Sequence, residues 1–155
     1  MDRTLTSEQG LTLVELILVV TIIGILIAIG MGDYRSISQV NSVNRDLNNM
    51  ATFLQDKRMA AFTKKSAIDV QTGVAAGTSF TQLSTNPNYG TVSTDNAFLA
   101  SAATFTINSR GIFSTTGSIR ISGSNYGAAR DCIVIANTRV RIGVWKSATS
   151  SCDPE

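Results

Sequence analysis

The chain has 155 residues, of which 43% are hydrophobic and 15% charged, and its formal net charge at pH 7 is +2. This length allows one compact domain with an appendage and is too short for two independent cores. Histidine is absent, so no imidazole can act as a general base or a metal ligand, which excludes most common hydrolase and zinc-enzyme designs. The small net charge neither predicts nor opposes binding to nucleic acid.

The N-terminal part begins with a short polar leader, residues 1–10, followed by a long apolar run, residues 11–32. As a helix, this run would extend about 33 Å, enough to cross the hydrocarbon core of a bilayer. Glu15 is the one charged residue in it. A carboxylate near bilayer depth costs about 3 kcal/mol unless something compensates. Glu15 therefore needs a cationic partner, or it must reach the headgroups from the helix end.

The junction of leader and apolar run, Gly10 followed by Leu11-Thr12-Leu13-Val14-Glu15, resembles the type IV prepilin signal. The resemblance implies that a prepilin peptidase cuts between Gly10 and Leu11, that the new amino group is methylated, and that Glu15 meets the N-terminal amine of a neighbouring subunit. It also implies a single-pass inner-membrane protein with a periplasmic head. Two features depart from the family pattern: Leu11 replaces the usual phenylalanine, and Arg3 is the only basic side chain of the leader.

Residues 33–65 predict an amphipathic continuation of this helix, because apolar side chains recur at steps near three and four. The apolar stripe comprises Ile37, Val40, Val43, Leu47, Met50, Leu54, Ala61 and Phe62. The polar face between them comprises Asn41, Asn44, Arg45, Asn48, Asp56 and Lys57. We expect the stripe to be covered by a sheet.

Residues 66–155 predict a β-rich head, because apolar side chains there alternate with polar ones. The alternating pairs are Ile68 and Val70, Phe105 and Ile107, and Ile119 and Ile121. Residues 132–136 are apolar on both faces and predict a central strand, and Asn137-Thr138 would connect it tightly to a last strand over residues 139–145. Residues 86–90 and 123–127 carry turn-forming residues. The fold class is therefore α+β, a long N-terminal helix packed on an antiparallel sheet.

Residues 104–143, with FTINSRGIFSTTGSIRIS followed by CIVIANTRVRIG, are similar to the GspH/FimT-type minor pilins and pseudopilins. The resemblance implies a long helix packed on β-sheets, low abundance and a place near a filament tip. Partners would then be other pilin or pseudopilin subunits.

The two cysteines, Cys132 and Cys152, belong to no CxxC pair and no cluster of metal ligands. A disulfide between them would close a loop of about 20 residues and stabilise the head by roughly 3 kcal/mol. Two unpaired buried thiols are the alternative.

A candidate nucleic-acid surface lies in the predicted last strand, where Arg139, Arg141 and Trp145 share one face because alternate side chains face opposite sides. Two guanidiniums could contact phosphates while the indole stacks on a base. Some FimT-type proteins bind DNA through a motif of glycine, arginine, any residue and arginine; this chain has Thr138 in place of the glycine. The alternative is that exposed arginines only keep an edge strand soluble. Arg130 and Lys146 would add charge nearby.

Three functional classes follow. The first is a structural or initiating subunit of a type II secretion pseudopilus or a type IV pilus. The second is a DNA-binding minor pilin for DNA uptake in natural transformation. An enzyme is disfavoured, because no nucleophile stands beside a base and no glycine loop follows a strand as a phosphate cradle. We expect no cofactor, no metal and no small-molecule substrate.

Overall fold

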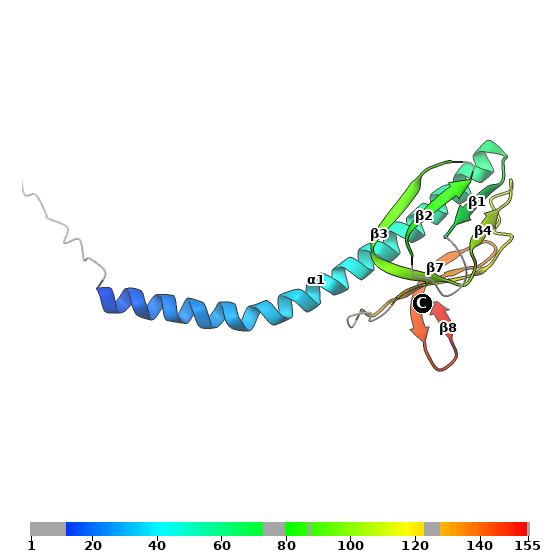
Figure 1. The fold of residues 1–155 in the computed structure, drawn as a ribbon. Helices are drawn as coiled ribbons and strands as arrows, with labels where there is room; N and C mark the ends of the chain where they lie inside the picture. The colour runs from blue at the N-terminus through cyan, green and yellow to red at the C-terminus, as the bar shows by residue number, and fades with distance from the viewer. Residues whose placement is uncertain (1–11, 73–79, 87, 123–127, 155) are drawn as a thin grey trace, which may run out of the picture. The chain divides into compact units, whose positions relative to one another are not determined.

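The computed structural model describes residues 12–72, 80–86, 88–122 and 128–154 (Figure 1). The chain divides into two compact units, residues 1–37 and residues 38–155. One helix, α1 (Leu13–Lys64), begins in the first unit and ends in the second. The expected fold class is confirmed, because this long helix packs on an antiparallel sheet.

Eight strands form a single sheet in the order β4-β1-β2-β3-β5-β6-β7-β8, and every neighbouring pair is antiparallel. Their bounds are β1 Ile68–Gln71, β2 Phe80–Asn86, β3 Thr91–Ala100, β4 Thr104–Ile107, β5 Gly117–Ile121, β6 Cys132–Ile135, β7 Val140–Lys146 and β8 Ser151–Pro154. Strand β4 pairs with β1 and not with β3, which precedes it in the chain. The expected strands β1, β4, β5, β6 and β7 are confirmed, whereas β2, β3 and β8 were not predicted.

The core forms between one stripe of α1 and one face of the sheet. Its α1 side chains, Val43, Leu47, Met50 and Leu54, are at most 1% exposed. On the sheet, opposite residues bury together: Ile68 lies across from Ile107, Val70 from Phe105, and Ile119 from Ile133. Each such side chain contributes about 1.5–3 kcal/mol through burial.

The predicted stripe of α1 is wrong at its two ends. Ile37 is 59% exposed and Phe62 is 50% exposed. Lys57, expected on the water-facing side, is buried at 8% exposure; its ammonium donates to Asp56 at 2.7 Å and lies 4.8 Å from the centre of the Phe53 ring. Lysine can bury its methylene stem while its charged end keeps polar partners, so a charged residue type alone does not mark a solvent-facing position.

A buried carboxylate, Asp46, fastens α1 to β3. It is 2% exposed and accepts hydrogen bonds from the backbone N–H groups of Asp95 at 3.2 Å and Asn96 at 2.8 Å. The side-chain amide of Asn96 also donates to Asp46 at 2.8 Å and to the Ser42 hydroxyl at 2.6 Å. These donors satisfy a charge that would otherwise be costly to bury.

Positive φ angles and local hydrogen bonds end α1 and form the turn between β2 and β3. Lys65 adopts a positive φ of 52°, and the N–H of Ser66 donates to the carbonyl of Ala61 at 3.3 Å, which closes the helix with a Schellman-type contact. Between β2 and β3, Asn88 accepts from the N–H of Gly90, whose φ is 111°. Residue 87 of the predicted turn at 86–90, and the whole predicted turn at 123–127, lie outside the described residues.

The β6–β7 connection is the expected tight hairpin. The N–H of Ala136 donates to the carbonyl of Arg139 at 2.9 Å, and the N–H of Arg139 donates back to Ala136 at 3.4 Å. Asn137 and Thr138 are thus the two loop residues. However, β7 is not the last strand, because β8 pairs along it from Lys146 to Gly143.

Candidate functional site

The first unit presents an apolar helix surface with no protein cover. Between Leu13 and Ile29, every large apolar side chain is exposed, from 44% at Val19 to 75% at Leu13. Among the described residues, α1 is the one helix long and apolar enough to cross a membrane, judged by length and composition. The apolar side chains point in all directions around the axis, as in a helix that needs an apolar environment on every side.

Glu15 lies in the first turn of α1, and its backbone N–H donates to the Thr12 hydroxyl oxygen at 3.3 Å. Thr12 is therefore the N-cap of the helix, and Thr12-x-x-Glu15 has the spacing of a capping box. A carboxylate at this end is also favoured by the positive pole of the helix dipole. This second role of Glu15 was not predicted, although the Thr-x-x-Glu pattern indicates it. The predicted processing residues Gly10 and Leu11 lie outside the described residues.

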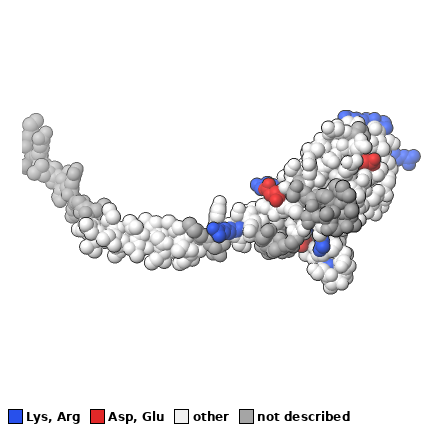
Figure 2. Space-filling model, in the orientation of Figure 1, with Lys and Arg blue, Asp and Glu red and all other residues white. Residues whose placement is uncertain are grey.

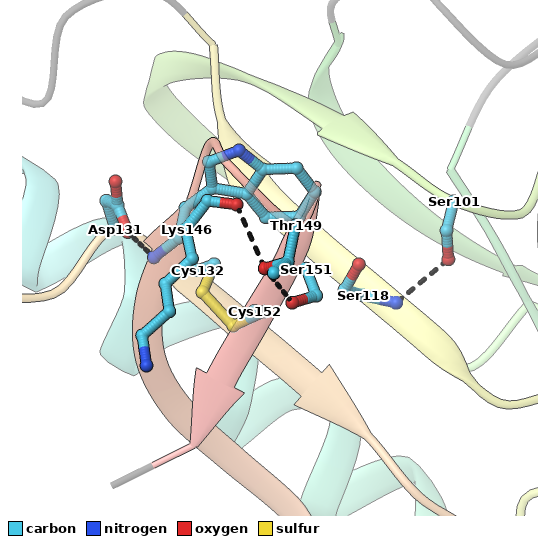
Figure 3. The surroundings of a disulfide bond; sticks show 9 residues. Ser101, Ser118, Asp131, Cys132, Lys146, Thr149, Ser151 and Cys152 are labelled. Atoms are coloured by element: carbon cyan, nitrogen blue, oxygen red, sulfur yellow. Dashed lines mark hydrogen bonds between the residues drawn. A yellow bond between two sulfur atoms is a disulfide. The ribbon is translucent and has the colours of Figure 1, made fainter.

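The two cysteines form a disulfide that joins β6 to β8 across the intervening strand β7 (Figure 3). The Cα atoms of Cys132 and Cys152 lie 6.0 Å apart, and neither thiol is free. Gly143 of β7 lets β8 approach closely, because a Cβ there would lie 2.9 Å from the Cα of Pro154 and 2.8 Å from the carbonyl carbon of Asp153. An ion pair between Lys146 and Asp153 holds the same hairpin.

Arg139 and Arg141 line a pocket of about 630 Å³ together with residues from two other parts of the head. Arg58, Met59 and Phe62 come from α1, Arg110 and Gly111 come from the β4–β5 connection, and Thr138 and Val140 complete the side formed by the β6–β7 hairpin. We call it the arginine pocket. Arg58 and Arg110 were not expected there, because they are distant from Arg139 in the sequence and no local pattern connects them.

Arg58 holds the walls of the arginine pocket in place. Its Nε donates to the carbonyl of Gly111 at 2.6 Å, and its Nη1 donates to the carbonyl of Thr138 at 2.5 Å. Gly111 has a φ of 73°, and a Cβ at this position would lie 3.1 Å from the Arg58 carbonyl oxygen. Only glycine adopts this conformation without strain at so close an approach.

Trp145 does not belong to the arginine pocket. It lines a second pocket with Ser101, Ser118 and Arg120, and the Arg120 guanidinium lies 4.5 Å from the centre of its ring. Its backbone N–H donates to Asp131 at 2.6 Å. The structure therefore brings Arg139 and Arg141 together but places Trp145 elsewhere, because the three residues span several positions along a twisted strand.

Of the two other cations expected near the arginine pair, Arg130 lies beside Arg141 and Lys146 does not. Arg130 lines a third pocket with Arg141, whereas Lys146 is paired with Asp153. The edge-strand explanation still applies to Arg141: it pairs with Val134 of β6, whereas among the described residues β8 pairs with β7 only from Gly143 to Lys146. In the part of the chain that the structure describes, no group of three or more His, Cys, Asp or Glu side chains is arranged to hold a metal ion.

Solved structures share this fold. Two crystal structures of the type IV minor pilin FimU from Pseudomonas aeruginosa are similar to this chain, with TM-scores of 0.53 and 0.51 and 13% sequence identity in each case. The matches cover 74% and 72% of this chain, and 95% and 98% of the FimU chains. No family model and no curated protein matches the sequence. The chain thus has a type IV pilin-like fold.

Proposed function

We propose that this protein is a minor pilin or pseudopilin, a structural or initiating subunit that assembles through its N-terminal helix into a type IV pilus or a type II secretion pseudopilus. The observation that carries the proposal is the exposed apolar segment of α1 with one carboxylate in its first turn, in a chain whose head has a type IV pilin-like fold. Such a segment gains stability only from lipid or from apolar helices of other subunits.

The proposed assembly contact joins Glu15 to the amino group of a neighbouring subunit. Cleavage between Gly10 and Leu11 by a prepilin peptidase would create that amino group, and the head would then lie in the periplasm, anchored in the inner membrane. Within an apolar bundle, opposite charges attract strongly because little water screens them. An unpaired Glu15 would be costly there, so correct axial register would be the arrangement that satisfies it.

Substitution of Glu15 tests the assembly contact, and Thr12 supplies the matched control. We expect Glu15→Gln to insert and be processed normally but to enter filaments about tenfold less, since roughly 1.4 kcal/mol of pairing energy corresponds to that factor. Thr12→Ala removes the cap and leaves the charge, so its incorporation should fall less. Filament incorporation is measured by immunoblot of sheared or cross-linked fractions. Equal incorporation of Glu15→Gln and the unmodified chain would refute the pairing role.

Processing is tested separately by mass spectrometry of the mature N-terminus. We expect the chain to begin at Leu11 and to carry a methyl group. A chain that still begins at Met1 in cells with active prepilin peptidase contradicts the processing proposal. Both machines use the same helix chemistry, so the helix does not distinguish them. The host filament is identified by whether the chain is found in surface pili or in a periplasmic pseudopilus.

The second candidate, a DNA-binding minor pilin, is supported by one observation: Arg139 and Arg141 are both exposed and share a pocket with two further arginines. Against it, Trp145 lies elsewhere and already has the Arg120 guanidinium over its ring. A gel-shift titration over salt concentration tests it. DNA binding through the arginine pair predicts a steep fall of affinity with salt, and a flat response removes this candidate.

A further inference from the structure

The arginine pocket has an apolar floor that the head leaves open. Met59 is 64% exposed and Phe62 is 50% exposed, and the two side chains are neighbours on α1 at a spacing of three residues. Val140 of β7, which is half-buried, lines the same pocket. Single exposed apolar residues are common, but here two of them, together with the half-buried Val140, line one concave site, as in sites that bury a partner's side chain.

The rim of the pocket is positively charged and contains no acid. Its lining includes Arg110, Arg139 and Arg141, all exposed, and no aspartate or glutamate. Within the described residues, none of these three guanidiniums forms an ion pair. Figure 2 shows lysine and arginine side chains gathered on the head around the region where α1 ends. Like charges held close together repel, so an anionic partner would be favoured at this rim.

The site is already organised for a partner. Arg58 uses its donors on the carbonyls of Gly111 and Thr138, and so connects α1 to the loops that carry Arg110 and Arg139. The Asn108 side chain accepts from the N–H groups of Arg110 at 2.9 Å and Ile112 at 3.1 Å, which fixes the β4–β5 turn. A preformed site binds more tightly because less conformational freedom is lost on binding.

The apolar floor of the arginine pocket favours a peptide over a nucleic acid. Lys65 lies 4.0 Å from the centre of the Phe62 ring, and Lys64 lies 3.9 Å from the centre of the Tyr89 ring. Lys65 covers one face of the Phe62 ring, which leaves less aromatic surface on which a base could stack, and Tyr89 does not line the pocket. Planar guanidiniums bind carboxylates and phosphates alike with paired hydrogen bonds. The exposed apolar surface of Met59 and Phe62, which suits an apolar side chain, therefore favours a peptide.

We propose that the arginine pocket binds an acidic segment of a partner protein, in which one bulky apolar side chain is flanked by carboxylates. The apolar side chain contacts Met59, Phe62 and Val140, and the carboxylates pair with Arg110, Arg139 and Arg141. The proposal does not depend on which filament, if any, the protein enters. In this proposal Arg139 and Arg141 contact a protein partner, whereas the sequence pattern alone suggested DNA.

A displayed library of random peptides tests the proposed chemistry without knowledge of the partner. The full chain is held in nanodiscs of zwitterionic lipid, and peptides are selected for binding to it. Peptides that also bind empty nanodiscs are removed. We expect a consensus with at least two Asp or Glu residues around one Leu, Ile, Met or Phe. A consensus without acids, or no consensus at all, overturns the proposal.

Fluorescence anisotropy with a labelled consensus peptide then locates the site. We expect Arg139→Gln with Arg141→Gln to weaken binding about tenfold or more, as for the loss of charge-assisted hydrogen bonds. Phe62→Ser should weaken it through the apolar floor. Arg45→Gln is the matched control, because Arg45 is an exposed arginine of α1 that pairs with Asp95 outside the pocket. Equal weakening by Arg45→Gln would show nonspecific charge attraction and refute the site.

Competition decides between the two classes of ligand. A single-stranded 12-nucleotide DNA and a duplex of the same length are added to the bound peptide at physiological salt. We expect displacement only at concentrations far above the peptide's Kd. Tight DNA binding that is lost in the double arginine variant, with no specific peptide, would replace this proposal with the DNA-binding candidate.

Discussion

Residues 13–29 and residues 43–54 belong to one helix, yet the exposure of their apolar side chains is opposite. In the first range every large apolar side chain is exposed, whereas in the second Val43, Leu47, Met50 and Leu54 are almost completely buried. The first range is apolar all round, so one sheet could never cover it, and the second has one apolar stripe that one sheet face covers. The head thus gains its stability from within the chain, whereas we propose that the first range gains it from lipid or other helices.

The largest expected effect tests the internal stability of the head. Phe105 is fully buried in the core, so Phe105→Ala should lower the free energy of unfolding by about 3–5 kcal/mol while membrane insertion persists. Denaturation followed through the single tryptophan, Trp145, measures it. Phe62→Ala is the control, because that ring is half exposed and its loss should cost less than about 1 kcal/mol. Similar losses at both positions would contradict the assignment of the core.

The converse test places a charge in the first range. Ile22→Asp should disfavour insertion by about 3 kcal/mol and leave the unfolding of the head unchanged, because Ile22 contributes nothing to the head core. Resistance to carbonate extraction measures insertion. Ile37→Asp carries the same change beyond the apolar run and should insert normally. If the Ile22 variant inserts as well as the unmodified chain, the first range does not depend on an apolar environment.

A disulfide bond stabilises the head, and residues 13–29 have no part in it. Replacing both Cys132 and Cys152 by serine should lower the free energy of unfolding by about 3 kcal/mol, because the bridge closes a loop with a sequence separation of 20. A reductant should destabilise the unmodified chain to the same extent. The double variant is its own control, since a reductant should not change it. Equal stability of both chains would contradict a structural role of the bridge.

The smallest expected effect concerns the polar joint between α1 and β3. Asp46→Ala should cost about 1–3 kcal/mol, because it removes the buried carboxylate that accepts from the partly buried N–H groups of Asp95 and Asn96. Asp95→Ala removes only an exposed ion pair with Arg45 and should cost less than about 1 kcal/mol. Chemical denaturation measures the free energy of unfolding of both variants. A larger loss for Asp95→Ala than for Asp46→Ala would contradict the role of Asp46 in joining α1 to β3.

Most of the fold could be predicted because its patterns are local. Alternation identified β1, β4, β5 and most of β7, and a continuous apolar segment identified β6 as an interior strand. Strand β8 was missed because Ser151–Pro154 is short and polar and is held by a hairpin and a disulfide. Strand β3 was missed because its polar middle is satisfied by Asp46, a residue of α1 that no neighbouring position indicates.

The candidate sites likewise divide into residues that a local pattern identifies and residues that only tertiary packing brings together. Glu15 and the two cysteines stand out by composition, since one is the lone charge in an apolar run and the others are the only thiols. The grouping of Arg139, Arg141 and Trp145 was only partly right, because strand alternation assigns a side of the sheet and says nothing of the twist along it. Arg58 and Arg110 reach the pocket through tertiary packing.

The sequence by itself therefore determined the apolar helix, its single carboxylate, the amphipathic continuation and the β-rich head, because each depends on side-chain types at spacings of a few residues. The tertiary structure decided what those elements bring together. It joined β6 to β8 across Gly143, anchored α1 to β3 through Asp46, and assembled four arginines around an open apolar floor. These arrangements connect residues far apart in the chain, and their energies depend on burial and geometry that no local pattern contains.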